Sequence, residues 1–165
     1  MAQIYISLGS NIEREYHVKH GLKALAEAFE LPFDALSLSS LFKSEAVGFD
    51  GVAFYNMVIG IKTPFSVVKV TTILRDIEVR FGRSPQAKKF SPRTLDLDLL
   101  LYDTLITNSP AQLPRDEIIK NAFVLWPLSE IAAKLTHPIC HNSYENLWQN
   151  YDKSSQALVM INKCW

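Results

Sequence analysis

The chain has 165 residues, 48% of them hydrophobic, and its 17 lysines and arginines balance 17 aspartates and glutamates. We therefore expect a single domain over residues 1–165, and the zero net charge argues against a nucleic-acid partner, which needs a broad basic face. No apolar run approaches the ~20 residues of a membrane span, no signal peptide is visible and two cysteines are too few for a disulfide framework, so we expect a cytoplasmic protein with no membrane partner.

Hydrophobic periodicity predicts a mixture of strands and helices. Apolar residues recur at every second position in the expected strands and at every third or fourth position in the expected helices. The first six elements are a strand at 4–8, a helix at 14–30, strands at 34–43 and 54–62, a helix from Pro64 to Gly82 and a strand at 93–101. This β-α-β-β-α-β order predicts a ferredoxin-like α+β sandwich.

The pattern after residue 101 predicts C-terminal helices and short strands. Strands are expected near 105–106 and 158–161, and helices after Pro114, after Pro127 and near 144–151. We see no linker that would divide the chain into two domains.

Residues 93–101 carry the most informative pattern, R-T-L-D-L-D-L-L-L. Because side chains alternate along a strand, Asp96 and Asp98 project from one face. Four leucines would occupy the opposite face: Leu95, Leu97, Leu99 and Leu101. Two carboxylates whose Cα atoms lie about 6.5–7 Å apart can jointly hold two Mg²⁺ ions, the arrangement that two-metal enzymes use on phosphates. Two solvated acids on an edge strand would give the same pattern.

A cationic stretch runs directly into this acidic pair. Residues 75–93 hold six basic and two acidic side chains, a local net charge of +4 in a chain whose total charge is zero. The basic residues are Arg75, Arg80, Arg83, Lys88, Lys89 and Arg93. Carboxylates that hold a metal, next to arginines that hold phosphate oxygens, would suit a metal–polyphosphate ligand.

The polar face of the aspartate strand is expected to line an open cleft. We expect this strand to lie centrally in the sheet that also contains the strand with Phe54 and Asn56. Helices would cover only the leucine side of the sheet, and two polar loops, at 44–53 and 83–92, would roof the other side.

Five segments in the right order resemble a known family. They are I-S-L-G-S-N (6–11), F-Y-N-M-V (54–58), I-E-V-R-F-G-R (77–83), S-P-R-T-L-D-L-D-L-L (91–100) and F-V-L-W-P-L (123–128). Together they resemble the 6-hydroxymethyl-7,8-dihydropterin pyrophosphokinases of folate biosynthesis. The resemblance implies transfer of pyrophosphate from ATP to the reduced pterin, with two Mg²⁺ ions and a monomeric enzyme.

The resemblance also implies roles for individual residues. Asp96 and Asp98 would bind the metal ions and, with Arg83 and Arg93, would be catalytic. The residues expected to contact the pterin are Ser44, Val47, Phe54, Asn56 and Phe123. Those expected to contact ATP are Arg75, Glu78, Arg83, Phe90, Arg93 and Arg115. A plainer explanation makes Phe54 and Phe123 ordinary core residues and pairs Glu78 with Arg75 across one helical turn.

Some positions depart from the family pattern, nearly all of them in the nucleotide half of the site. They are Pro85, Ser91, Arg115, Asp116 and Asn121. Lost cationic donors predict an enzyme with a raised ATP requirement. Two other functions fit the same residues: a pterin-binding paralogue with weak or no catalysis, and a two-metal nucleotidyltransferase.

Overall fold

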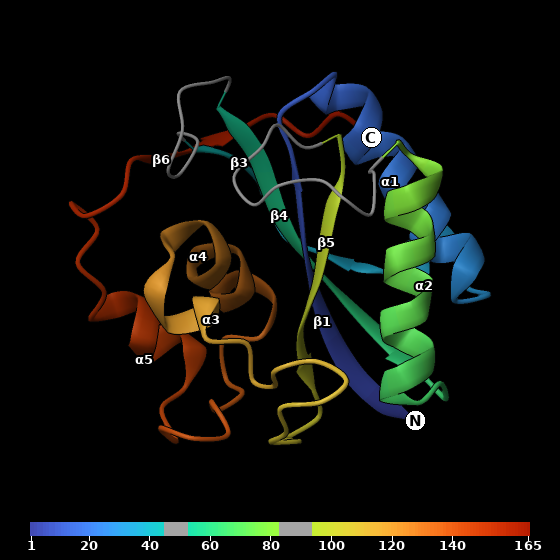
Figure 1. Cartoon of the computed structure of the whole chain (residues 1–165). Helices are drawn as coiled ribbons and strands as arrows, with labels where there is room; N and C mark the ends of the chain where they lie inside the picture. Colours follow the sequence, from blue (N-terminus) through green and yellow to red (C-terminus); the bar gives the residue numbers. More distant parts are fainter. Residues whose placement is uncertain (45–52, 83–93) are drawn as a thin grey trace.

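The computed structural model describes residues 1–44, 53–82 and 94–165 (Figure 1). Its strands are β1 (Ala2–Ser10), β2 (Ser37–Leu38), β3 (Leu41–Ser44), β4 (Phe54–Thr63), β5 (Asp96–Tyr102) and β6 (Leu158–Ile161). Its helices are α1 (Arg14–Ala28), α2 (Val67–Arg80), α3 (Glu117–Lys120), α4 (Ala122–Ile131) and α5 (Tyr144–Gln149), with a 3₁₀ helix at Phe33–Ala35. Among these, no helix has the length and apolar character that would let it cross a membrane.

One antiparallel sheet organises these elements. Its strand order is β5-β1-β4-β3-β6, and β2 pairs with β4 beside β3. With the short β2 and β3 taken together in the place of the strand predicted at 34–43, the order up to β5 is β-α-β-β-α-β and confirms the predicted ferredoxin-like α+β sandwich. The prediction of a central aspartate strand is wrong, because β4 and β5 pair with opposite sides of β1 and this leaves β5 at the end of the strand order.

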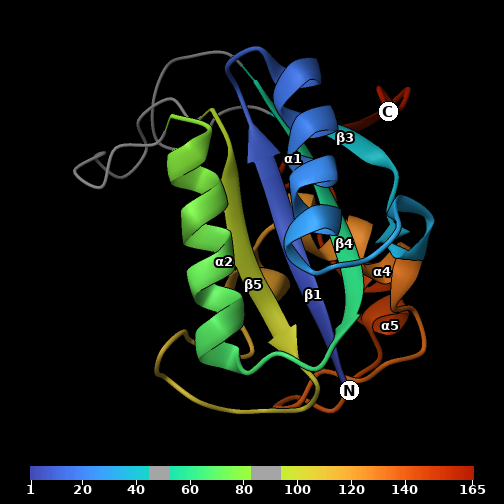
Figure 2. The same ribbon diagram turned by 90° about the vertical axis from the view of Figure 1, so that its right-hand side faces the viewer.

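Helices cover both faces of the sheet, whereas the sequence predicted helices on one face only. Figure 2 shows α1 and α2 on one side, and Figure 1 shows α3, α4 and α5 on the other. The first core lies under α1 and α2 and includes Ile6, Leu22 and Leu74. The second core joins Tyr5 and Val58 of the sheet to the C-terminal helices. The prediction missed this second layer because Tyr5 and Val58 interrupt the polar face of β1 and β4 and offer apolar side chains for the C-terminal helices to cover.

A bulge in the pairing of β1 with β5 explains where the leucine alternation ends. The register shifts between Tyr5 and Ile6, so that Ile6 pairs with Leu99 but Tyr5 pairs with Leu101. An extra residue in one strand reverses the faces of the residues beyond it. Leu95, Leu97 and Leu99 therefore lie in the first core, while Leu101 joins the second core, contrary to the predicted single leucine face.

Three other predicted elements differ from the structure. The strand expected at 34–43 is a 3₁₀ turn and two short strands, since the Ser39 hydroxyl accepts the Val58 N–H and interrupts the ladder. No strand forms at the described residues 105–106, and only an isolated bridge joins Thr107 to Leu113. Helix α4 begins at Ala122 and includes Pro127 instead of following it, while the strand expected at 158–161 is confirmed.

Candidate active site

A row of residues across three strands brings the two halves of the predicted site together. In the register of the sheet, Asp96 of β5 pairs with Gly9 of β1, and Gly9 pairs with Asn56 of β4. Neighbouring strands lie about 4.8 Å apart, so Asp96 and Asn56 are about 10 Å apart across Gly9. Asp98 lies in the next row on the same face, opposite Ser7. Carboxylates at one end of this row and an amide at the other leave a surface between them wide enough for a small ligand.

Gly9 lies at the middle of this row, and the sequence analysis did not single it out as a candidate site residue. A Cβ atom added there would lie 3.2 Å from Asn56 Oδ1 and 3.6 Å from Phe54 Cδ1. Glycine therefore leaves open the space between the aspartates and the Asn56 amide. The signal was available in I-S-L-G-S-N, because a glycine inside a strand pattern often marks a close approach of a ligand or another chain.

A side chain of helix α2 holds strand β5 at the position of the two aspartates. The backbone N–H of Leu97, which lies between Asp96 and Asp98, donates a hydrogen bond of 2.9 Å to Glu78 Oε2. A carboxylate that accepts an edge N–H satisfies a donor that the end strand would otherwise present to solvent. Glu78 thus reaches β5, which the simple pairing with Arg75 did not predict, and Arg75 is exposed on α2.

Arg115 is one cation beside the acidic pair. Its Nη2 lies 3.5 Å from Asp98 Oδ1 and 2.8 Å from Glu117 Oε1. Burial lowers the pKa of Arg115, but the charges of Asp98, Glu117 and Asp96 outweigh burial and hold this pKa above its ordinary value. The guanidinium therefore stays charged next to the predicted metal ligands.

The other two described departures from the family pattern have partners of their own. Asp116 is exposed and forms an ion pair of 2.9 Å with Lys120. Asn121 Nδ2 donates to Glu117 Oε2 at 3.3 Å, and Asn121 Oδ1 accepts from Gln156 Nε2 at 3.0 Å. The structure thus links Asn121 to the carboxylate that holds Arg115.

The predicted pterin residues of β3 and β4 lie on the same face as the aspartates. Asn56 Nδ2 donates a hydrogen bond of 2.6 Å to Ser44 Oγ, and both side chains are buried. Phe54 lies next to this pair at half burial, and Phe123, also half-buried, packs against the second core at the start of α4. These four residues place polar and aromatic groups on one side of the sheet, as a planar heterocycle would require.

Four predicted site residues lie outside the described part of the chain. They are Val47, Arg83, Phe90 and Arg93, and the substituted positions Pro85 and Ser91 fall there too. The two loops predicted to roof the cleft, at 44–53 and 83–92, also fall largely outside the described residues. Their roles remain predictions.

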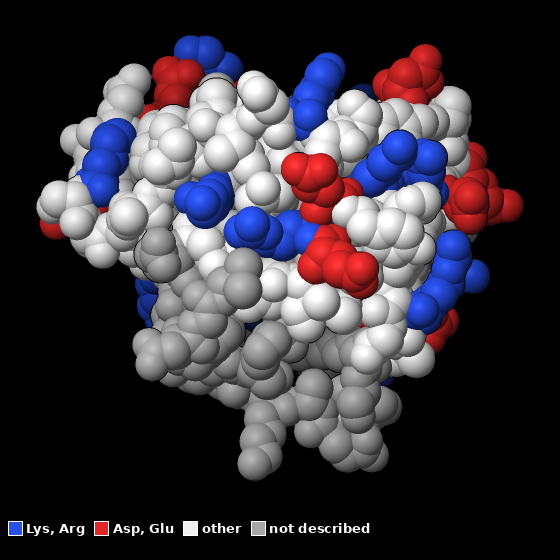
Figure 3. Space-filling model, turned by 90° about the horizontal axis from the view of Figure 1, so that it is seen from above, with Lys and Arg blue, Asp and Glu red and all other residues white. Residues whose placement is uncertain are grey.

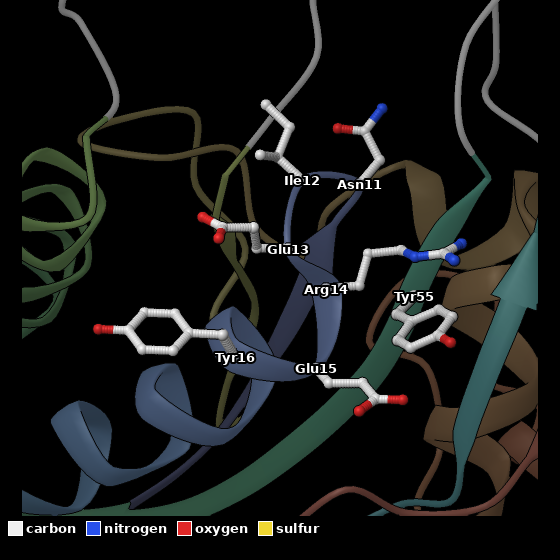
Figure 4. Close-up of a pocket in the computed structure, with 7 residues that line it drawn as sticks. All are labelled: Asn11, Ile12, Glu13, Arg14, Glu15, Tyr16 and Tyr55. Carbon is white, nitrogen blue, oxygen red and sulfur yellow. The ribbon is translucent and has the colours of Figure 1, made fainter.

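A cavity of about 640 Å³ lies elsewhere, between the end of β1 and the start of α1 (Figure 4). Residues 11–16 and Tyr55 line it. Tyr55 alternates with Phe54 and Asn56 along β4 and packs against the first core, so this cavity opens on the other face of the sheet. The Arg14 guanidinium lies 4.2 Å from the Tyr55 ring centre and donates to the Ala53 carbonyl at 2.9 Å. The residues that line this cavity include none of the predicted metal or pterin residues, so the candidate active site is the Asp96–Gly9–Asn56 row on the opposite face of the sheet.

The charged surface of the described residues is mixed in sign. Seen from above, lysine and arginine side chains alternate with aspartates and glutamates, without a large field of one sign (Figure 3). This distribution fits a small charged ligand better than a long polyanion.

Comparison with known proteins identifies the family. The model of the 7,8-dihydro-6-hydroxymethylpterin-pyrophosphokinase (HPPK) family matches residues 5–133. The chain belongs to the HPPK family. It is 31% identical over 142 residues to the 2-amino-4-hydroxy-6-hydroxymethyldihydropteridine pyrophosphokinase of Aquifex aeolicus, covering 84% of this chain and 86% of that relative. It is 35% identical over 141 residues to the enzyme of the same name from Haemophilus influenzae, with the same two coverages.

The fold of this HPPK family member is similar to that of a solved structure. The wild-type HPPK-DHPS of Plasmodium falciparum with SDX-DHP superposes with a TM-score of 0.64 at 11% sequence identity. The match covers 92% of this chain but only 44% of that longer chain, so it bears on the fold alone. Membership of the HPPK family confirms the predicted pyrophosphokinase class, with ATP as the co-substrate of the family.

Proposed function

We propose that this chain transfers the pyrophosphate group of ATP to the hydroxymethyl group of 6-hydroxymethyl-7,8-dihydropterin, a step of folate biosynthesis. The pterin hydroxyl oxygen attacks the β-phosphorus in line, and the bond from that phosphorus to the oxygen shared with the α-phosphate breaks. AMP leaves, the hydroxyl proton passes to solvent and the pterin diphosphate is formed. Holding the two substrates in line provides most of the rate in such transfers.

Asp96 and Asp98 would hold two Mg²⁺ ions. Both side chains are partly exposed on one face of β5, and their oxygens are the hard ligands that Mg²⁺ prefers. The described residues contain no group of three or more histidine, cysteine or acidic side chains suited to a metal ion. A two-carboxylate site still suits Mg²⁺, which commonly takes one or two carboxylates and completes its shell with phosphate and water. Bound there, Mg²⁺ would neutralise charge on the phosphates.

The triphosphate would lie between β5 and the basic residues around it. Arg83 and Arg93 would hold its oxygens, and Arg115 lies beside Asp98 on the same face. Arg75, Glu78 and Phe90 would complete the nucleotide site, with Glu78 acting through its bond to the Leu97 N–H.

The pterin would bind over the Asn56 end of the row. The buried Asn56 amide would pair with the polar edge of the ring, oriented by its bond to Ser44. Phe54 and Phe123 would pack on the faces of the ring, and the backbone at Ser44 and Val47 would complete the edge contacts. Gly9 would leave the hydroxymethyl group space to point toward the aspartates.

The observation that carries this proposal is the Asp96–Gly9–Asn56 row, which brings the proposed metal ligands and the proposed pterin-binding amide onto one sheet face. The test incubates purified protein with Mg²⁺, ATP and the pterin and measures AMP. We expect AMP only when the pterin is present, and its loss in Asp98→Asn but not in the control Asp34→Asn, an exposed acid of the 3₁₀ helix. Pterin binding without AMP would indicate a pterin-binding paralogue. Nucleotide transfer that needs no pterin would indicate a nucleotidyltransferase.

We further propose that the chain acts as a single-domain monomer in the cytoplasm, on small-molecule substrates and without nucleic-acid or membrane partners. The balanced charge and the two free cysteines, Cys140 and Cys164, support this setting. Sedimentation of the purified protein near 18.7 kDa would be the expected result, and a stable dimer would contradict it.

A further inference from the structure

The position of Arg115 suggests a role beyond a simple phosphate contact. Two nitrogens of its guanidinium face Glu117 Oε1, with Nε and Nη2 each at 2.8 Å. The contact from Nη2 to Asp98 Oδ1 is longer, at 3.5 Å. Arg115 is therefore anchored on Glu117 and leans toward Asp98 as a counter-ion.

The anchor is itself held in place by the C-terminal part of the chain. Glu117 Oε2 accepts from Asn121 Nδ2, and Asn121 Oδ1 accepts from Gln156 Nε2. The backbone N–H of Arg115 donates to the Leu100 carbonyl of β5 at 3.0 Å. The backbone hydrogen bond and the contact with Glu117 thus hold the Arg115 side chain in position. Its longer contact with Asp98 is weaker, so a ligand of Asp98 or of the guanidinium can replace it.

This arrangement opposes the binding of a metal ion by itself. A dication at Asp98 would replace the attraction of Arg115 for that carboxylate with a repulsion between two cations a few ångströms apart. A polyphosphate that arrives with the metal reverses the balance, because the guanidinium can then bind its oxygens without leaving Glu117.

We propose that Arg115, held by Glu117, is an internal counter-ion that couples metal binding to nucleotide binding. Without ligands it neutralises Asp98, and with metal and nucleotide it transfers to a phosphate. Each ligand then binds more tightly in the presence of the other, by the same factor in both directions. The inference deepens the proposed function and rests on it, since it takes Asp98 as a metal ligand.

The test measures binding and requires no turnover. Mn²⁺ serves as the probe of the metal site, followed by electron paramagnetic resonance, and α,β-methylene-ATP serves as the nucleotide, followed by calorimetry with and without Mg²⁺. Arg115→Ala should bind Mn²⁺ alone about threefold to fivefold more tightly, the range expected for a partly exposed ion pair. It should bind the nucleotide with Mg²⁺ at least about tenfold more weakly, because a charge-assisted bond is lost. The control Lys134→Ala removes an equally positive, exposed side chain that pairs with Glu145, and should change neither affinity.

A second pair of variants tests the anchor. Glu117→Gln should weaken Mn²⁺ binding in the wild-type background, because the released Arg115 turns fully to Asp98, and it should have a much smaller effect when Arg115 is already alanine. Arg115→Lys keeps the positive charge but lacks the planar guanidinium, so the coupling between metal and nucleotide binding should be intermediate. This variant still tests the proposal if circular dichroism shows that Arg115→Ala folds poorly.

The outcomes separate this inference from the proposed function. Unchanged or weaker Mn²⁺ binding in Arg115→Ala, in a protein that still forms AMP from pterin and ATP, would overturn the counter-ion role and leave the function intact. A wild-type protein that shows no Mg²⁺-dependent binding of the nucleotide would overturn both.

Discussion

Replacing Gly9 with alanine should weaken pterin binding while leaving the free energy of unfolding nearly unchanged. The added Cβ would lie 3.2 Å from Asn56 Oδ1, a few tenths of an ångström closer than an ordinary contact. Asn56 has little freedom to retreat, because its Nδ2 is bonded to Ser44 Oγ at 2.6 Å and its side chain is buried. The methyl group would also project into the space that the hydroxymethyl group of the pterin is proposed to occupy.

The size of each effect follows from these contacts. Misplacing a buried amide that binds ligand costs about 1–3 kcal/mol, which weakens pterin binding by roughly fivefold to 150-fold. The free energy of unfolding should change by less than about 1 kcal/mol, because the chain-entropy gain of alanine over glycine in a strand offsets the tight contact. We therefore expect a raised apparent KM for the pterin, an unchanged KM for ATP and a nearly unchanged melting temperature.

Gly60→Ala is the matched control for this prediction. Gly60 lies on β4, and a Cβ there would meet Tyr5 Cε1 at 3.0 Å and Ser37 Cβ at 3.3 Å. Because the Tyr5 ring is buried, this variant should lower the melting temperature while leaving pterin affinity unchanged. The reasoning is refuted if Gly9→Ala binds a pterin analogue as tightly as the wild-type protein does in a calorimetric titration, or if Gly60→Ala weakens that binding equally.

Four further predictions concern the remaining parts of the chain. Asp98→Asn should abolish AMP formation and change the melting temperature little, because its ion pair with Arg115 is partly exposed; normal turnover would exclude the metal role. Asn56→Ala should weaken binding of a pterin analogue by about 1–3 kcal/mol in calorimetry, and an unchanged affinity would place the pocket elsewhere. Asn121→Arg should lower the apparent KM for ATP and leave pterin binding unchanged; no effect on steady-state kinetics would mean that the lost cation is already replaced. Burial, with a smaller effect of His141, lowers the pKa of His137, whose Nδ1 accepts the N–H groups of Ile139 and Cys140. Below the ordinary histidine pKa of about 6.5, the unfolded chain therefore binds more protons than the folded chain, and the free energy of unfolding falls as the pH drops. His137→Gln should make the melting temperature less dependent on pH between about pH 7 and pH 5.

Local periodicity predicted the strands and helices that surround the site because it depends only on neighbouring residues. Asp96 and Asp98 do share a face, as two positions two residues apart on a strand must. The α2 helix ends at Arg80, close to the predicted Gly82, and the sandwich follows from the order of the elements. The family resemblance added roles that spacing alone leaves open, and the comparisons confirm the family itself.

Long-range pairing decided the features that the sequence pattern missed. The lateral order of strands depends on which edges pair, and the alternation within a strand is the same at the centre of a sheet and at its end, so the position of β5 was predicted wrongly. The bulge opposite Tyr5, which moves Leu101 to the second core, depends on the partner strand in the same way.

The site shows the same division between local and tertiary information. The sequence by itself determined the chemical groups: two carboxylates on one strand face, an amide and a phenylalanine on another, and a nearby set of arginines. Only the tertiary structure decided that Gly9 stands between the two faces and that Arg115 is anchored on Glu117 beside Asp98. The physical reason is that side-chain direction along a strand is set by neighbouring dihedral angles, whereas register and ion pairing are set by contacts between residues far apart in the chain.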